Sequence, residues 1–450
     1  MVRREAVREY AGGALWLLPF LTANGAIVVG LAASRIDAPD GSVLARLAFQ
    51  GTADDARSVL MAIAGTVVTV IALVLGLSVV ALQLSSTQFS PRLLRNFLRD
   101  RPNQVMLSVF MATFAYSGAG LYTVGVAAGS RTEQFPRLAV SGAIALLFAS
   151  LATVVIFADH LSHSIQIDAI MRRVERETLA VIRTGADDVE DTPPAPPSWA
   201  LPLRASRSGY LQTAHPETLL PVAVRHDAVV ALQRRVGEHV VAGSTIGWVW
   251  RRTEQEPAPD RGGFERAVAD AVGIGFERTR QQDVAIGIRQ LVDVACKALS
   301  PAVNDPYTAV QAVDHLAVIF SEMGRHTLGT RVGRDGQGRV AVVVPSRRFG
   351  EYLETMAGLV RRYGSGEPTV AIAMLHLLED CREAVGADPE RLADLAGQAE
   401  LVLIDAEREI AQPADLVPVR VAAQRLLQRL GPPAGPDRPV PAQGAGIIVS

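Results

Sequence analysis

Cysteine and lysine are almost absent from this chain of 450 residues. Its two cysteines, Cys296 and Cys381, lie far apart without CxxC spacing, which excludes a disulfide framework or a zinc ribbon and is compatible with a reducing compartment. Lys297 is the single lysine, so nearly every cation is an arginine. The formal net charge of −2 gives no reason to expect a nucleic-acid partner.

Recognisable catalytic motifs are absent as well. The sequence contains no Walker loop, no GxGxxG that opens a helix after a strand, no HExxH and no GxSxG. Lys297 and Ser300 lie three residues apart across a proline-flanked helix end, and no histidine is near them in the sequence, which argues against a nucleophile–base pair. We therefore expect no enzyme and no cofactor or metal site.

Charge is scarce in the N-terminal part of the chain. Charged residues make up 20% of the whole sequence and the mean hydropathy is +0.22, whereas soluble globular proteins have about 25% charged residues. Crossing a bilayer takes roughly 20 apolar residues. Four stretches without any charge meet that length, and we predict four transmembrane helices within residues 1–160. These stretches are 10–34, 58–83, 104–129 and 138–158.

Arginine counts in the flanking segments predict the orientation of these helices. The N-terminal tail, the segment after the second helix and the segment after the fourth, up to Arg176, together hold ten arginines, against five in the two opposite loops. Short cytoplasmic loops carry such an excess. We therefore expect a multi-pass protein of the bacterial inner membrane with both termini in the cytoplasm and the lipid bilayer as a partner.

The central turns of the predicted helices contain no ionisable residue, although pumps and ion-driven transporters usually keep one there. Small residues recur at four-residue spacing in the first helix, at Ala26, Gly30 and Ser34, and allow close helix packing. Hydroxyl residues in the second helix are compatible with two arrangements: they line a water-filled pore, or they bond back to their own helix. These candidate pore-lining residues are Thr66, Thr69 and Ser78.

The segment after the fourth helix begins the cytoplasmic half. Residues 161–190 are expected to extend that helix, and a stiff proline-rich linker at 192–197 follows. Short strands at 209–211, 228–232 and 245–250, separated by glycine and charged turns, predict a small β-module at 199–252. Within it, residues 236–243 resemble the turn of biotinyl and lipoyl barrel-sandwich domains, but the carrier lysine is missing, which excludes a covalently loaded arm.

Beyond this module, amphipathic patterns predict a mainly helical domain at 263–430. A tail at 431–450, rich in proline and glycine, is expected to be disordered. The predicted fold class is therefore a membrane α-helical part with four transmembrane helices, joined to a cytoplasmic α+β domain.

A polar corner in the helical domain is the main candidate site. Asp283 is predicted to cap one helix, and Ser300-Pro301 and Asp305-Pro306 are both signals for a helix start. Helix N-termini that meet beside arginines are suited to an anion or a polar metabolite. The same side chains could instead only cap helices and fix the backbone of the corner. The candidate ligand-binding residues are Arg278, Arg280, Asp283, Lys297, Ser300, Asn304, Asp305 and Thr308.

Two segments carry a family resemblance. Residues 297–309, KALSPAVNDPYTA, and residues 85–92, SSTQFSPR, resemble two signatures of a bacterial family of predicted membrane proteins whose function is unknown. The resemblance spans roughly residues 10–425. It implies the architecture described above and supplies no activity, so no catalytic role is transferred.

Two functions remain open at this point. The first is a channel-like permeation protein, gated by the cytoplasmic domain and built as a homo-oligomer, because four short-looped helices are few for a monomeric carrier. The alternative is a membrane-anchored sensor or scaffold whose cytoplasmic domain binds a small anionic or polar ligand or a protein partner.

Overall fold

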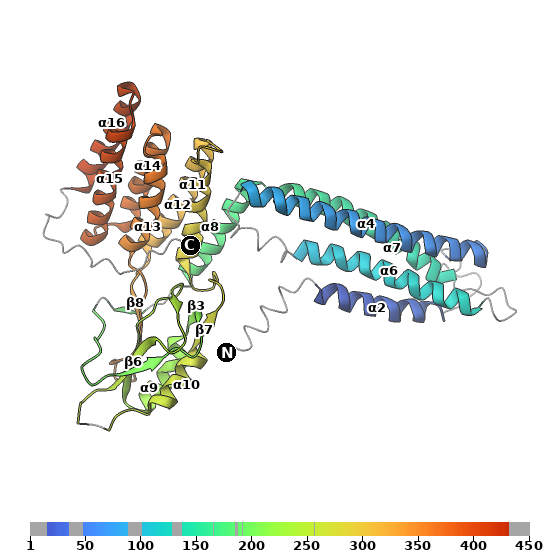
Figure 1. Ribbon diagram of the computed structural model, residues 1–450, viewed down its shortest axis with the longest axis horizontal. Coiled ribbons are helices and arrows are strands. Elements are labelled where there is room, and N and C mark those ends of the chain that lie inside the picture. The colour runs from blue at the N-terminus through green and yellow to red at the C-terminus, as the bar shows by residue number, and fades with distance from the viewer. Residues whose placement is uncertain are drawn as a thin grey trace. The chain divides into compact units, whose positions relative to one another are not determined.

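The computed structural model describes residues 16–35, 48–88, 101–127, 137–164, 166–184, 188–190, 192–255 and 257–431. The chain divides near Ile170 into two compact units, which are described separately (Figure 1). Several features predicted from the sequence lie outside these described residues. These are residues 10–15 of the first predicted span, residues 128 and 129 of the third, residues 89–92 of the SSTQFSPR signature, and the tail after Gly431.

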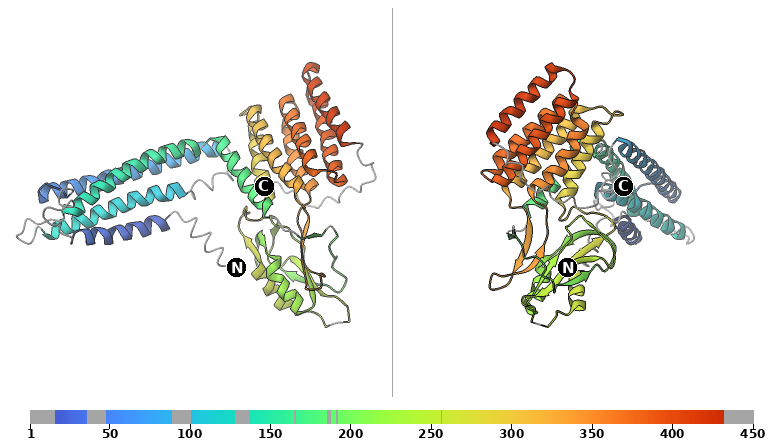
Figure 2. Two further views of the ribbon diagram at one scale, coloured as in Figure 1. Left: turned by 180° about the vertical axis from the view of Figure 1, so that it is seen from behind. Right: turned by 60° about the vertical axis from the view of Figure 1, so that its left-hand side comes forward.

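The first unit is a bundle of long apolar helices, in which α6 packs against α2, α4 and α7 (Figure 2). Its core is apolar: Leu60, Phe110 and Val140 are at most 1% exposed. The described helices of this unit are α2 (Leu17–Ala33), α4 (Ala53–Gln88), α6 (Arg101–Ala127) and α7 (Arg137–Ser164).

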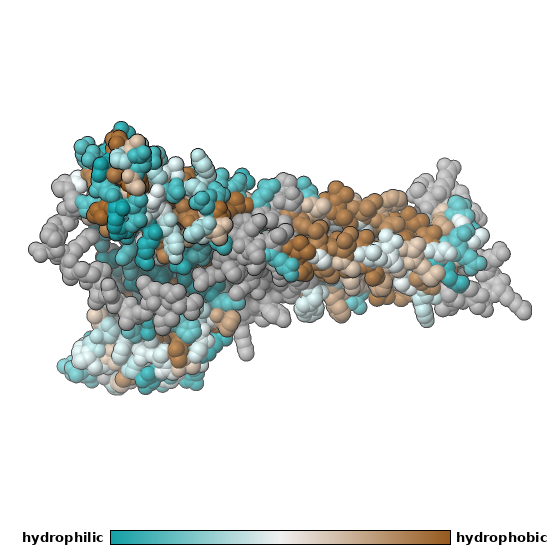
Figure 3. Space-filling view, turned by 45° about the horizontal axis from the view of Figure 1, so that its top comes forward, coloured by the Kyte–Doolittle hydropathy of each residue, from teal (hydrophilic) through white to brown (hydrophobic). Residues whose placement is uncertain are grey.

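The outer surface of this bundle is apolar too, as its hydrophobic covering in Figure 3 shows. Leu73 is 71% exposed, and Phe148 and Ile156 are each 67% exposed. Such an apolar surface suits contact with lipid acyl chains and not with water. Among the residues that the structure describes, three helices are long and apolar enough to cross a membrane, over Ala53–Val80, Arg101–Val124 and Arg137–Leu161. A membrane α-helical part is therefore confirmed.

The first predicted span, residues 10–34, corresponds to α2, which is apolar but has 17 described residues, fewer than the roughly 20 that a span needs. Helix α2 packs closely on α6 at Gly30, where an added Cβ would lie 3.1 Å from the Cβ of Ala119. The small side chain of Gly30 therefore allows α2 and α6 to pack closely, as the four-residue spacing of small residues predicted.

The second unit is α+β. Its larger sheet has the strand order β1-β8-β9-β4-β6-β2 and its smaller sheet the order β5-β3-β7. The three strands predicted at 209–211, 228–232 and 245–250 are confirmed as β3, β4 and β6. The strand bounds are β1 Val189–Glu190, β2 Leu201–Arg204, β3 Gly209–Ala214, β4 Ala228–Leu232, β5 His239–Val240, β6 Thr245–Arg251, β7 Val272–Gly275, β8 Thr330–Arg334 and β9 Val340–Val344.

The β-module predicted at 199–252 is not a separate unit. Strand β9 pairs in parallel with β4, with Val230 opposite Val342, and β7 pairs with β3. Helices α9 (Pro216–Arg225) and α10 (Arg261–Ala271) contribute Leu219 and Phe264 to the same core. The resemblance to a barrel-sandwich therefore does not extend to the topology. Strands about a hundred residues apart pair here, and local sequence patterns do not encode such pairing. The boundary of the module could therefore not be predicted from the sequence.

The helical remainder follows the predicted pattern and forms the layer of helices seen in Figure 2. Four of its helices begin with proline, which suits the first helical position because no amide hydrogen is required there. The helices are α11 (Val284–Ala298), α12 (Pro306–Arg325), α13 (Phe349–Gly364), α14 (Pro368–Val385), α15 (Pro389–Glu409) and α16 (Pro413–Leu430).

The predicted helical extension at 161–190 differs from the structure. Helix α7 ends at Ser164 and a separate amphipathic helix, α8, spans Ile167–Arg183. The Gln166 carbonyl accepts hydrogen bonds from the amides of Ala169 and Ile170, which starts the new helix. Beyond α8, Val189 and Glu190 form β1 and pair with β8. The extension is therefore a second helix followed by a strand.

Candidate functional site

The predicted ligand site separates into two groups at opposite ends of α11. Arg278, Arg280 and Asp283 precede its first residue, Val284, whereas the other five candidates follow from Lys297 onward. A helix of 15 residues is about 22 Å long at 1.5 Å per residue. The structure therefore does not bring the eight residues into one site.

At the C-terminal end of α11, Asp305 caps α12 as predicted. Its carboxylate accepts hydrogen bonds from the Thr308 amide at 3.1 Å and from the Thr308 hydroxyl at 2.6 Å, and these bonds hold the pKa of Asp305 below its usual value. The acceptor oxygens of Asp305 are thus occupied within the corner itself.

Ser300 and Asn304 do not cap helices in the predicted way. The Ser300 hydroxyl donates to the Lys297 carbonyl at 2.7 Å, and no helix starts at Pro301. Asn304 adopts the left-handed φ of +49°, which asparagine tolerates better than most residues, and the Asp305 amide then closes the turn on the Ala298 carbonyl at 2.8 Å. These residues fix backbone geometry.

At the N-terminal end of α11, Asp283 occupies the capping position without a capping hydrogen bond. Its carboxylate instead accepts from Arg278 Nε at 2.7 Å, and its side chain is 2% exposed. The turn at Gly237, with φ +90°, packs against this pair, since an added Cβ would lie 2.5 Å from Asp283 Oδ2. The predicted helix cap is therefore a buried ion pair that the neighbouring turn contacts.

Arg280, the third member of this group, points to α8. It pairs with Glu177 of that helix. Burial, followed by the charge of Arg173, lowers the pKa of Arg280 to about 10. Arg280 therefore ties α8 to the start of α11 rather than facing a ligand.

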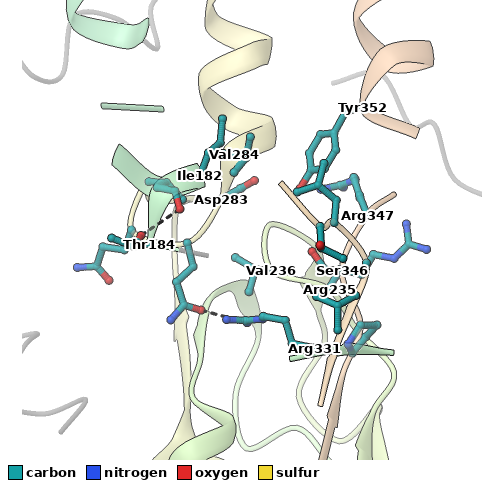
Figure 4. A pocket seen from close by; sticks show the side chains of 18 residues that line it. Ile182, Thr184, Arg235, Val236, Asp283, Val284, Arg331, Ser346, Arg347 and Tyr352 are labelled. Carbon is teal, nitrogen blue, oxygen red and sulfur yellow. Dashed lines mark hydrogen bonds between the residues drawn. The ribbon is translucent and has the colours of Figure 1, made fainter. Parts of the chain in front are cut away.

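A cavity of about 290 Å³ lies beside this buried ion pair, entirely within the second unit. Ile182 of α8 and Asp283 and Val284 at the start of α11 lie on one side, and Arg347 and Tyr352 on the other (Figure 4). Of the eight residues predicted for ligand binding, only Asp283 lines it.

Three arginines line the cavity, and they differ in what balances their charge. Arg235 pairs with Glu351 at 2.5 Å. Arg331 donates to the Ala214 carbonyl at 3.3 Å and weakly to Gln282 Oε1 at 3.5 Å, and burial lowers its pKa. Arg347 lies 6.0 Å from the centroid of the Tyr352 ring. Within the described part of the chain, neither Arg331 nor Arg347 has a carboxylate within 4.0 Å.

Sequence reasoning missed these arginines, although two of them carried a signal. Arg235 comes three residues after β4, and Arg347 comes three residues after β9. Because these two strands are parallel neighbours, their carboxyl ends meet at one edge of the sheet, where ligands of mixed and parallel sheets bind. Two buried apolar runs each followed by a pair of arginines could have indicated this edge; Arg331, within β8, gave no comparable signal.

The three hydroxyl residues predicted to line a pore lie on α4. Thr66 and Thr69 are exposed on the surface of the described bundle. The Thr69 hydroxyl donates to the Gly65 carbonyl at 3.0 Å, and the Ser78 hydroxyl donates to the Val74 carbonyl at 2.8 Å. For these two residues the described contacts are those of hydroxyls that bond back to their own helix.

Known proteins match this chain over most of its length. The family described as "Predicted membrane protein (DUF2254)" matches residues 13–380. Uncharacterized protein Rv1290c of Mycobacterium tuberculosis and uncharacterized protein Mb1321c of Mycobacterium bovis are each 42% identical to it over 432 residues, which is 95% of this chain and 82% of theirs. No solved structure matches.

Proposed function

Because the chain belongs to the DUF2254 family of predicted membrane proteins, we propose that it is a membrane-anchored binding protein whose second unit takes a small anionic ligand. The observation that carries this proposal is the cavity lined by Arg331 and Arg347, two cations without a described carboxylate partner. Both side chains are partly buried, and desolvating a charge that has no close carboxylate is unfavourable, so an anion in the cavity supplies compensation. The channel stays a prediction from the sequence.

The connection to the membrane supports a sensing role. Ile182 and Thr184, at the end of α8 and just after it, line the cavity. Helix α8 begins three residues after α7 ends at Ser164, and α7 contains one of the candidate spans. A ligand in the cavity would therefore contact the segment that follows the membrane helix directly in the chain.

We extend the proposal to the membrane arrangement. The uncharged stretch 10–34 is long enough in the sequence for a fourth span, and the structure describes α2 within it. The excess of arginines on one side supports an inner-membrane protein with both termini in the cytoplasm. A homo-oligomer remains part of this proposal, and crosslinking of single-cysteine variants in membranes tests it.

Ligand-dependent thermal stability of the full chain in detergent tests the binding function. A panel of small anions is expected to include one that raises the Tm of the wild type, since a ligand that binds only the folded state stabilises it. Arg331→Met should abolish this rise while keeping the apolar stem of the side chain. Arg266→Met, which changes an exposed arginine of α10, is the matched control. The proposal fails if no anion in the panel raises the Tm, or if Arg331→Met responds like the control.

A further inference from the structure

The charges around the cavity leave a surplus of two. Arg235 is balanced by Glu351 at 2.5 Å, and Asp283, the carboxylate in the described lining, is balanced by Arg278 at 2.7 Å. Arg331 and Arg347 remain without a carboxylate within 4.0 Å among the described residues. Glu217, outside the lining, acts on Arg331 electrostatically, so the ligand that neutralises the lining carries up to two negative charges.

We propose that the cavity binds the phosphate group of a small phosphorylated compound, an inference that rests on the proposed anion-binding function. A phosphate monoester carries about −1.5 to −2 charges at pH 7 and has three strong acceptor oxygens. Guanidinium groups match such oxygens with two parallel N–H donors. A single carboxylate has one charge and two oxygens, and would leave one of the two arginines uncompensated.

Neutral groups in the same wall complete the recognition. Burial raises the pKa of Tyr352, so its phenol stays protonated and can donate a hydrogen bond at neutral pH. Ser346 lies on the same side of the cavity, beside Arg347 (Figure 4). Donors and cations thus gather where the chain leaves β9, which assigns the phosphate to that side.

The size of the cavity and its apolar lining residues limit the rest of the ligand. Val236, Leu328 and Ile182 add apolar surface to the lining. A volume of about 290 Å³ is at the lower end of the roughly 300–1,000 Å³ typical of ligand pockets. The cavity therefore suits one phosphate with a short organic part, and not a nucleotide.

Isothermal titration of the purified full chain with matched probes tests this inference. The probes are glycerol phosphate, inorganic phosphate, short-chain phosphatidic acid, sulfate and succinate. We expect glycerol phosphate to bind the wild type and Arg266→Met alike, and at least tenfold more weakly to Arg331→Met and to Arg347→Met. Inorganic phosphate or phosphatidic acid binding more tightly than glycerol phosphate would support phosphate recognition and identify free phosphate or a lipid headgroup as the source.

The pH dependence provides a second readout. The second pKa of a phosphate monoester is about 6, so the dianion falls about tenfold between pH 7 and pH 5, and the affinity should fall with it. Sulfate stays a dianion over this range and reports any change in the charge of the protein itself, including the pair of His215 with Glu217, because the charge of Glu217 acts on Arg331.

Three results would count against the inference. Succinate binding without phosphate binding would overturn it and leave the proposed anion-binding function standing. Equal affinity for glycerol phosphate at pH 5 and pH 7, after correction by sulfate, would overturn recognition of the dianion. No binding of any probe, with a folded protein shown by a cooperative thermal transition, would overturn both the inference and the proposed function.

Discussion

The two ends of α11 contain similar residue types but differ in what their charges contact. At the C-terminal end, Asp305 is bound by Thr308 and the Ser300 hydroxyl by the Lys297 carbonyl. At the N-terminal end, a buried ion pair adjoins a cavity in which two arginines have no described carboxylate partner. Polar residues of a motif whose hydrogen-bonding atoms are paired locally thus stabilise the backbone conformation. A cavity with charged side chains that lack a counter-ion is the better candidate for a ligand site.

The largest stability effect is expected at the buried pair. Asp283→Ala removes the carboxylate that balances Arg278, and leaving one member of a buried pair uncompensated costs about 3 kcal/mol. In a domain of this size such a loss lowers the Tm by about 6–12 °C. Asp283→Asn keeps an acceptor for Arg278 and should therefore lower the Tm by less than Asp283→Ala does. Equal Tm values for Asp283→Ala and the wild type would show that this end of α11 is not held by the pair.

Gly237 provides a sharper test of the same end. Alanine at this position meets Asp283 Oδ2 at 2.5 Å and must also adopt φ +90°, so Gly237→Ala should cost about 2–3 kcal/mol. Gly243 has φ +79° with no atom within 4 Å of an added Cβ, so Gly243→Ala should cost only the backbone strain of about 1 kcal/mol. Thermal denaturation of both variants separates the clash from the strain. A smaller loss of stability for Gly237→Ala than for Gly243→Ala would contradict the close packing of the Gly237 turn against Asp283.

The opposite end should respond more weakly and with a defined pH dependence. Asp305→Ala removes a helix cap and should cost about 1 kcal/mol. Because the folded-state pKa of Asp305 is lowered, its contribution is fully present above the unfolded pKa of about 3.9 and is lost as the pH falls through the folded value. The Tm difference between wild type and variant should therefore be constant from pH 5 to 8 and shrink below about pH 4. A Tm difference that grows as the pH falls would contradict a lowered folded-state pKa of Asp305.

The smallest effect is expected at Asn304. Glycine accepts the left-handed φ of +49° without a Cβ, so Asn304→Gly should change the free energy of unfolding by less than about 0.5 kcal/mol, whereas Asn304→Ala should cost about 1 kcal/mol. Equal losses for the two variants would mean that the Asn304 side chain, and not the backbone, supports the corner.

The sequence predicted local features well because they depend on neighbouring residues. The apolar runs, the three strands in 199–252 and the proline-started helix at Pro306 all follow from residue type and spacing. The Asp305 cap was predictable in the same way, since its partner Thr308 is three residues away.

Long-range features could not be read in this way. The parallel pairing of β4 with β9 joins Val230 to Val342, and only this pairing brings Arg235 and Arg347 to one edge of the sheet. Asp283 carried a sound helix-start signal, yet its carboxylate accepts from Arg278, five residues earlier, and the turn at Gly237 packs against this pair. The packing of the Gly237 turn on this pair and the position of the cavity are tertiary features, and local patterns do not encode them.

Titration of glycerol phosphate into matched variants from the two ends of α11 tests the central claim most directly. The account predicts that Asp305→Ala binds like the wild type after correction for stability, while Arg331→Met binds at least tenfold more weakly. Retained binding in Arg331→Met together with lost binding in Asp305→Ala would move the ligand site to the corner at Ser300 and contradict the account.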